Sequence, residues 1–141
     1  MRSALVALFA LWCGYVSNAV AQGGFVIVGH PDAGFAQLSL EEAQQLYLGR
    51  RNTLPDGSLA TLIDLPAGPQ RDQFYLLLTG KNPGQIRAWW SRQVFSGRAL
   101  PPLEARDTDE VRRWIGTQPK AIGYLPEDET TAGLRILLRL R

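Results

Sequence analysis

The chain has 141 residues, with 15 basic and 13 acidic side chains and a formal net charge of +2. This near-neutral balance lacks the electrostatic footprint of a nucleic-acid-binding protein, so we expect no nucleic-acid partner. A single cysteine excludes an internal disulfide framework, and the length suits one domain with one hydrophobic core.

The first 21 residues are predicted to be a cleavable signal peptide. Residues 1–2 form a short basic start, residues 4–16 are apolar, and Ala19-Val20-Ala21 has the small-x-small pattern that signal peptidase requires. A membrane anchor is the alternative, although the apolar run is short for a bilayer. We expect cleavage before Gln22, export to the periplasm, and a mature domain at residues 22–141 that has no cysteine and does not span the membrane.

The first half of this domain predicts a strand, a helix and a second strand. Residues 25–28 form an apolar, β-branched run typical of a strand that is buried on both faces. A capping box at residues 39–42 predicts the start of a helix, which Gly49 can end in the left-handed conformation. Residues 59–65 predict the second strand, with Asp64 near its carboxyl end.

Two further helices are predicted to begin at Pro69 and Asn82. Proline suits the first position of a helix because it has no amide to leave unpaired, and asparagine is a good N-cap. The tryptophans of the second helix are expected in the core, with an aromatic ligand platform as the alternative. The residues expected on the buried sides are Phe74, Leu77 and Leu78 in the first helix, and Ile86, Trp89, Trp90 and Val94 in the second.

The last part of the chain predicts a proline-rich connection at residues 96–106, a helix capped by Asp107, and strands at residues 121–125 and 134–141. The final strand alternates strictly, which predicts that one side is buried; a basic peptide on a membrane surface is the alternative. Strands that alternate with helices indicate an α/β domain, whose ligands bind beyond the carboxyl ends of the strands. The inward residues expected in the final strand are Leu134, Ile136, Leu138 and Leu140.

No catalytic, metal or cofactor site is predicted. His30 follows the first strand, where a catalytic base is conceivable, but no nucleophile elbow accompanies it. Residues 127–129 are acidic but lack the ligand spacing of a calcium loop, so we expect a solvated turn. Gly80-Lys81 lacks the flanking residues of a phosphate-binding P-loop. The sequence therefore favours a binding protein over an enzyme.

The start of the helix at residues 68–71 is the candidate ligand site. Backbone amides and the positive end of the helix dipole favour an anion there, and Arg71 can add charge-assisted hydrogen bonds. Because every helix has such an end, a simple strand-to-helix connection in which Arg71 pairs with a surface carboxylate is the alternative.

Four segments in order resemble the carboxyl-terminal half of phosphate ABC transporter substrate-binding proteins, especially the short, single-lobe proteins of that superfamily. They read LSLEEAQQLYLGRRNTLPDG, DLPAGPQRDQF, WWSRQVFSGR and TQPKAIGYL, and the resemblance extends from about Phe25 to Leu125. The resemblance implies a single-lobe type 2 periplasmic-binding-protein-like fold, with a mixed sheet flanked by helices. It also implies an exported solute-binding role in phosphate uptake, with a membrane transporter as partner.

The resemblance assigns ligand binding to Gly68, Gln70 and Arg71, with phosphate or a similar oxyanion as ligand. In the transporters' binding proteins this helix start usually reads Ser-Gly-Thr-Arg, whereas this chain has Gly68-Pro69-Gln70-Arg71, so only the arginine is kept. The chain is also about half the length of two-lobed binding proteins, so closing a site over the ligand would require dimerisation or a partner.

A second hypothesis is a non-enzymatic periplasmic interaction module that has kept the fold and lost its ligand. Such a module would present the loop at residues 98–106, or the arginine-rich tail, to another periplasmic protein.

Overall fold

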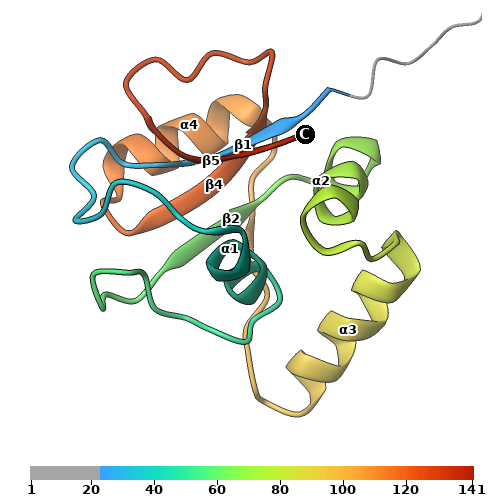
Figure 1. Cartoon of the computed structure of the whole chain (residues 1–141). Coiled ribbons are helices and arrows are strands. Elements are labelled where there is room, and N and C mark those ends of the chain that lie inside the picture. Colours follow the sequence, from blue (N-terminus) through green and yellow to red (C-terminus); the bar gives the residue numbers. More distant parts are fainter. Residues whose placement is uncertain (1–22) are drawn as a thin grey trace, which may run out of the picture.

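The structure is a computed structural model that describes residues 23–141; the predicted signal peptide lies outside these residues. It contains one five-stranded mixed sheet with helices on both faces, which confirms the predicted α/β class (Figure 1). In chain order the elements are β1 (Phe25–Gly29), α1 (Leu40–Tyr47), β2 (Thr61–Asp64), α2 (Pro69–Thr79), α3 (Pro83–Phe95), β3 (Leu103–Glu104), α4 (Thr108–Thr117), β4 (Ala121–Pro126) and β5 (Arg135–Leu140).

The strands lie in the order β3-β2-β4-β1-β5. β2 is parallel to β3 and β4, whereas β1 is antiparallel to β4 and β5. β1 is buried along its whole length, as its continuous apolar sequence predicts, because it is flanked by two strands and covered on both faces.

The two faces of the sheet are covered by different helices. Tyr124 of β4 stacks on Phe74 of α2, with ring centroids 3.5 Å apart, and its ring also meets Tyr47 of α1 edge to face. The preceding residue of β4, Gly123, faces the opposite way, since a Cβ there would lie 2.8 Å from Val111 of α4. Therefore α1 and α2 cover one face of the sheet and α4 covers the other (Figure 1).

The predicted helix starts are confirmed. Ser39 caps α1 and Asn82 caps α3, each with a reciprocal capping box in which side chains satisfy backbone amides in both directions. Gly49 follows α1 with a φ of 68°, the left-handed conformation expected where that helix ends.

The expected buried sides of α2 and α3 were partly wrong. Leu77 is 37% exposed and Val94 is 48% exposed, while Tyr75 and Gln93 are buried instead. The buried side of α2 therefore includes Tyr75, whose hydroxyl donates a hydrogen bond to the carboxylate of Asp64 at the end of β2. Trp90 is buried as predicted, whereas Trp89 is only half-buried.

The strict alternation expected for the last strand was also wrong. Leu138 pairs with Ile27 and Ile136 pairs with Val28, so the register skips Leu137 at a β-bulge. The bulge turns Leu137 inward, where it is buried, although the alternation places it on the outer side with the arginines. The tail is thus an edge strand paired to β1.

β3 was not predicted. It is a two-residue strand within the proline-rich connection, and Leu103 and Glu104 pair in parallel with Ile63 and Asp64 of β2. This pairing brings the connection alongside the carboxyl end of β2, next to the start of α2.

Candidate functional site

The predicted binding residues lie in one turn at the start of α2, just beyond the carboxyl end of β2. Gly68 is the N-cap and has no side chain to bond the first amides, and Pro69 occupies the first helical position. Gln70 is exposed, and the Arg71 side chain is 26% exposed. The first amides of a helix have no partner within the helix, so this turn presents N–H groups beside one guanidinium.

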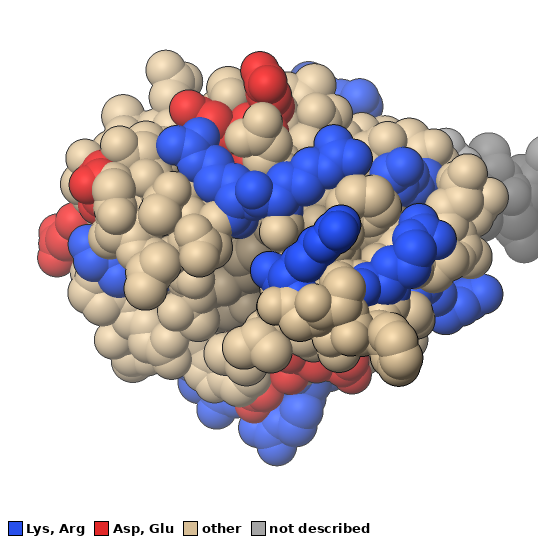
Figure 2. Space-filling view, turned by 90° about the horizontal axis from the view of Figure 1, so that it is seen from below, with Lys and Arg blue, Asp and Glu red and all other residues tan. Residues whose placement is uncertain are grey.

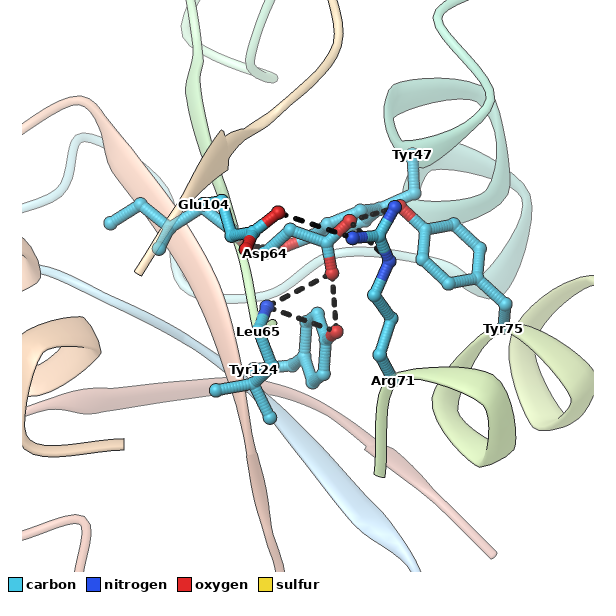
Figure 3. Close-up of polar contacts among 8 residues, drawn as sticks. Tyr47, Asp64, Leu65, Arg71, Tyr75, Glu104 and Tyr124 are labelled. Carbon is cyan, nitrogen blue, oxygen red and sulfur yellow. Dashed lines mark hydrogen bonds and ion pairs between the residues drawn. The ribbon is translucent and has the colours of Figure 1, made fainter. Parts of the chain in front are cut away.

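Arg71 lies between two carboxylates (Figure 3). Its Nε is 3.5 Å from Oδ2 of Asp64, and its Nη1 is 3.6 Å from Oε2 of Glu104. Asp64 ends β2 and Glu104 ends β3, and their Cα atoms are direct partners in the parallel pair. Arg71 therefore does pair with a carboxylate near the surface, as the alternative from the sequence states. An anion at this turn would compete with two carboxylates for Arg71.

Asp64 is buried and fully engaged by donors. Its Oδ2 accepts a hydrogen bond of 2.8 Å from the Tyr75 hydroxyl, and its Oδ1 accepts from the Leu65 amide at 3.0 Å and from the Tyr124 hydroxyl. These donors come from α2, from the residue that follows β2 and from β4, so the carboxylate joins three parts of the chain beside the start of α2 (Figure 3).

Burial shifts the acid–base properties of this network. Desolvation raises the pKa of Asp64 above its usual value, although the Arg71 charge and the three hydrogen bonds oppose the shift. Burial also raises the pKa values of Tyr47, Tyr75 and Tyr124, and the negative charge of Asp64 raises them further. All three phenols therefore remain protonated, and those of Tyr75 and Tyr124 act as donors to Asp64.

A small hollow of about 60 Å³ lies between the first turns of α2 and α3. Arg71, Tyr75 and Arg87 line it, together with the carboxylate of Asp72. A water molecule occupies about 30 Å³ in the liquid, so the hollow has room for a small ion. A much larger hollow lies elsewhere, between the end of α1, α3 and the segment before β3.

Sequence reasoning missed the roles of Asp64 and Glu104. An acidic residue that ends an apolar strand, just before a Pro-Gly turn, was a usable signal for Asp64. Glu104 gave no such signal, because only the unpredicted β3 places it beside Arg71.

The other candidate residues are not brought to this site. His30 accepts a hydrogen bond of 3.0 Å at Nδ1 from the Asp32 amide, within its own loop. Glu127 pairs with Arg141, and Glu129 pairs with Arg112. Gly80 ends α2 in the left-handed conformation, so Gly80-Lys81 forms a helix C-terminus and no phosphate loop.

Within residues 23–141, no group of three or more His, Cys, Asp or Glu side chains is arranged to hold a metal ion. No helix in the described part of the chain has the length and apolar character needed to cross a membrane.

No protein-family model matches the sequence, and no curated protein matches it closely enough to be called a relative. Solved structures do match the fold. A protein from Clostridium perfringens, assigned as a phosphate ABC transporter substrate-binding protein and solved with bound phosphate, aligns with a TM-score of 0.63 and 12% identity. The alignment covers 82% of this chain and 44% of that protein.

Two further structures give similar results. An ABC-type phosphate transport receptor from Vibrio cholerae aligns with a TM-score of 0.64 and 13% identity, and covers 82% of this chain and 45% of the receptor. A protein from Planctomyces limnophilus, assigned as phosphate binding, aligns with a TM-score of 0.60 and 12% identity, over 82% and 40% of the two chains. The described residues thus have the fold of phosphate ABC transporter substrate-binding proteins, over less than half the length of those proteins.

Proposed function

We propose that this protein is an exported, non-enzymatic solute-binding protein that binds phosphate or a similar oxyanion weakly at the start of α2. The observation that carries the proposal is the position of Arg71, which is partly open to solvent in the first turn of α2, beyond the carboxyl end of β2. Ligands of open α/β sheets bind at this edge, and the helix dipole adds attraction for an anion. Gly68, Gln70 and Arg71 are the proposed binding residues.

The two carboxylates favour an oxyanion that carries a proton. Carboxylate oxygens only accept hydrogen bonds, so Glu104 repels a fully ionised anion but can accept a hydrogen bond from the hydroxyl of hydrogen phosphate. Sulfate has no proton to donate at neutral pH. We therefore expect phosphate to bind more tightly than sulfate.

The first experiment is thermal unfolding of the protein with millimolar phosphate or sulfate at fixed ionic strength. A ligand at 100 times its dissociation constant adds about 2.7 kcal/mol to the free energy of unfolding, so a site whose dissociation constant lies well below the ligand concentration gives a visible shift. We expect phosphate to raise the melting temperature and sulfate to raise it less. Equal shifts with both anions would mean general ion effects and would count against the site.

Variants at the helix start test the assignment directly. Arg71→Lys keeps a charge beside Asp64 but loses the planar fork, so phosphate binding measured by calorimetry should weaken. Gln70→Thr restores one hydroxyl of the resembling family and should tighten binding, whereas Gly68 is kept because its φ of 156° strains any other residue. If both variants and Arg71→Ala bind phosphate as the wild type does, the residue assignment is wrong.

Export can be tested separately. We propose that residues 1–21 are removed during secretion, so the protein recovered from the periplasm should begin at Gln22. Amino-terminal sequencing of that fraction measures this, and a start at Met1 would contradict it.

A periplasmic interaction role is the second candidate, because Leu100 is 87% exposed in the proposed loop. The carboxyl end of the 98–106 loop is unsuitable for replacement, since Ala105 is buried and its amide donates a hydrogen bond to the carbonyl oxygen of Asp64. Replacing only residues 98–102 should abolish a specific complex without unfolding the chain. The tail is less available, because Arg135 donates to the carbonyl oxygens of Ala33 and Phe35.

A further inference from the structure

The larger of the two hollows described above has a basic and apolar lining. Its volume is about 720 Å³, and it lies between the end of α1, the outer part of α3 and residues 97–103. We call it the basic groove. It is on the face shown in Figure 2, where basic side chains gather around a depression in the surface. Arg50, Arg51 and Arg98 line it, together with leucines, prolines and the ring of Trp90.

The arginines that line the basic groove have no carboxylate partner within the described chain. No Asp or Glu lines it, and Arg50, Arg51 and Arg98 have no carboxylate oxygen within 4.0 Å among residues 23–141. Arg50 lies over the ring of Trp89, 4.7 Å from its centroid, and the neighbouring Arg92, which also has no carboxylate partner among the described residues, lies 6.0 Å from the same centroid. Acidic side chains gather elsewhere, around α4 and β4, where they pair with other arginines.

Apolar side chains are exposed in the same place. Leu59, Val94, Leu100 and Leu103 all line the groove and all remain exposed, and Phe95 beside them is 96% exposed. Contiguous exposed apolar groups that are rimmed by charge mark interaction sites on soluble proteins. The Nε1–H of Trp90, a groove-lining ring, also has no acceptor in the described structure.

We infer that the basic groove binds an acidic polypeptide segment that carries apolar anchor residues. Arginine presents a planar fork that matches carboxylates, so three arginines without a carboxylate partner in the described chain, set around an apolar hollow, complement alternating acidic and apolar side chains. Inorganic phosphate would fill only a small part of about 720 Å³ and would leave the leucines exposed. A flat bilayer surface does not enter a hollow, and a net charge of +2 gives little general attraction to nucleic acid. This inference rests on the interaction role proposed above and names the chemistry of its partner.

The test uses a panel of fluorescein-labelled peptides in which glutamates alternate with leucine or phenylalanine at different spacings. A matched panel replaces every glutamate by glutamine. We expect saturable binding of at least one acidic peptide, measured by fluorescence anisotropy, with a dissociation constant that rises with salt. The glutamine peptides should bind at least about tenfold more weakly, as the loss of several exposed charge pairs predicts.

Two pairs of variants locate the site. Arg51→Gln with Arg98→Gln should weaken binding about tenfold, whereas Arg139→Gln on β5, at the opposite edge of the sheet, should not. Leu100→Glu should also abolish binding, whereas Leu76→Glu, at an exposed leucine of α2 outside the groove, should leave it intact. All five positions are at least partly exposed, so the variants should fold, and circular dichroism checks this.

The outcomes are distinct. If no peptide saturates at millimolar concentration, or if glutamine peptides bind equally well, the acidic partner is ruled out. Binding lost in Leu100→Glu but unchanged in the arginine variants would overturn the charge inference and leave the interaction role standing. If the protein sediments with phosphatidylglycerol vesicles and Leu100→Glu abolishes this, the partner is a membrane and the peptide is ruled out. If ultracentrifugation shows a dimer that Leu100→Glu abolishes, the partner is a second copy of the chain. If phosphate still raises the melting temperature of all these variants, the phosphate site at the start of α2 is independent of the basic groove.

Discussion

At the scale of single residues, Asp64 sets the charge and the hydrogen bonds around the start of α2. It is a buried carboxylate that joins Arg71, Tyr75 and Tyr124, so the arginine that the resemblance assigns to an anion already has a partner inside the protein. The same carboxylate gives the protein two measurable responses to pH.

The first response is to acid. Because the folded-state pKa of Asp64 is raised above 3.8, the folded state holds this proton more tightly than the unfolded state. The free-energy contribution of Asp64 should therefore become more favourable as the pH falls through the raised pKa towards 3.8. Urea unfolding of the wild type and of Asp64→Asn should show the wild type gaining relative stability on acidification. A relative loss would mean that the Arg71 ion pair outweighs burial.

The second response is to base. Tyr47, Tyr75 and Tyr124 have raised pKa values in the folded state, whereas in the unfolded chain they ionise near 10.0. Above that pH each tyrosine should reduce the free energy of unfolding by about 1.4 kcal/mol per pH unit. Ultraviolet titration should show these three phenols ionising only when circular dichroism reports unfolding. Tyrosinate absorbance from all of them in the folded state would contradict the buried network.

At the scale of elements, the contact between α4 and β4 depends on Gly123 of β4, whereas Gly116 of α4 has open space beside it. A Cβ at Gly123 would lie 2.8 Å from Val111 Cγ1 and 2.9 Å from Ile115 Cδ1, whereas a Cβ at Gly116 would meet nothing within 4 Å. Val111 has little freedom to move aside, because its side chain is branched at Cβ.

We therefore expect Gly123→Ala to destabilise the protein by about 1–3 kcal/mol through overpacking between α4 and the sheet. Gly116→Ala is the matched control and should stabilise the protein by up to about 1 kcal/mol, because alanine is the better helix former. Thermal unfolding of both variants measures the difference. Equal effects would mean that α4 can shift away from β4 at little cost.

At the scale of the whole molecule, the last strand, β5, forms one edge of the sheet. β1 is the first strand of the described chain, and it lies between β4 and β5, the last two. Leu137 and Leu140 of β5 are buried in the core, so the tail is part of the fold.

Deleting residues 134–141 should leave β1 as an exposed, apolar edge strand, and such edges aggregate. We expect loss of the cooperative unfolding transition, with the product sedimenting as aggregates. Arg139→Gln, which removes only an exposed charge of the same strand, is the control and should unfold like the wild type. A folded, monomeric deletion variant would show that the β1–β5 pairing is dispensable.

The sequence by itself determined the elements whose signals are local. The capping boxes at Ser39 and Asn82, Pro69 at the start of a helix and the apolar run of β1 each depend on neighbouring residues, so they were predictable and are confirmed. The turn that carries Gly68, Gln70 and Arg71 was located for the same reason. Their role as ligand residues remains a prediction, because it comes from the resemblance.

Only the tertiary structure decided what surrounds these residues. Glu104 reaches Arg71 through a parallel pairing of two short strands, and Leu137 turns inward at a bulge that no alternation pattern contains. The basic groove likewise joins Arg51 at the end of α1 to Arg98 after α3. Contacts between residues so far apart in the chain depend on strand register and helix packing, which local sequence patterns do not specify.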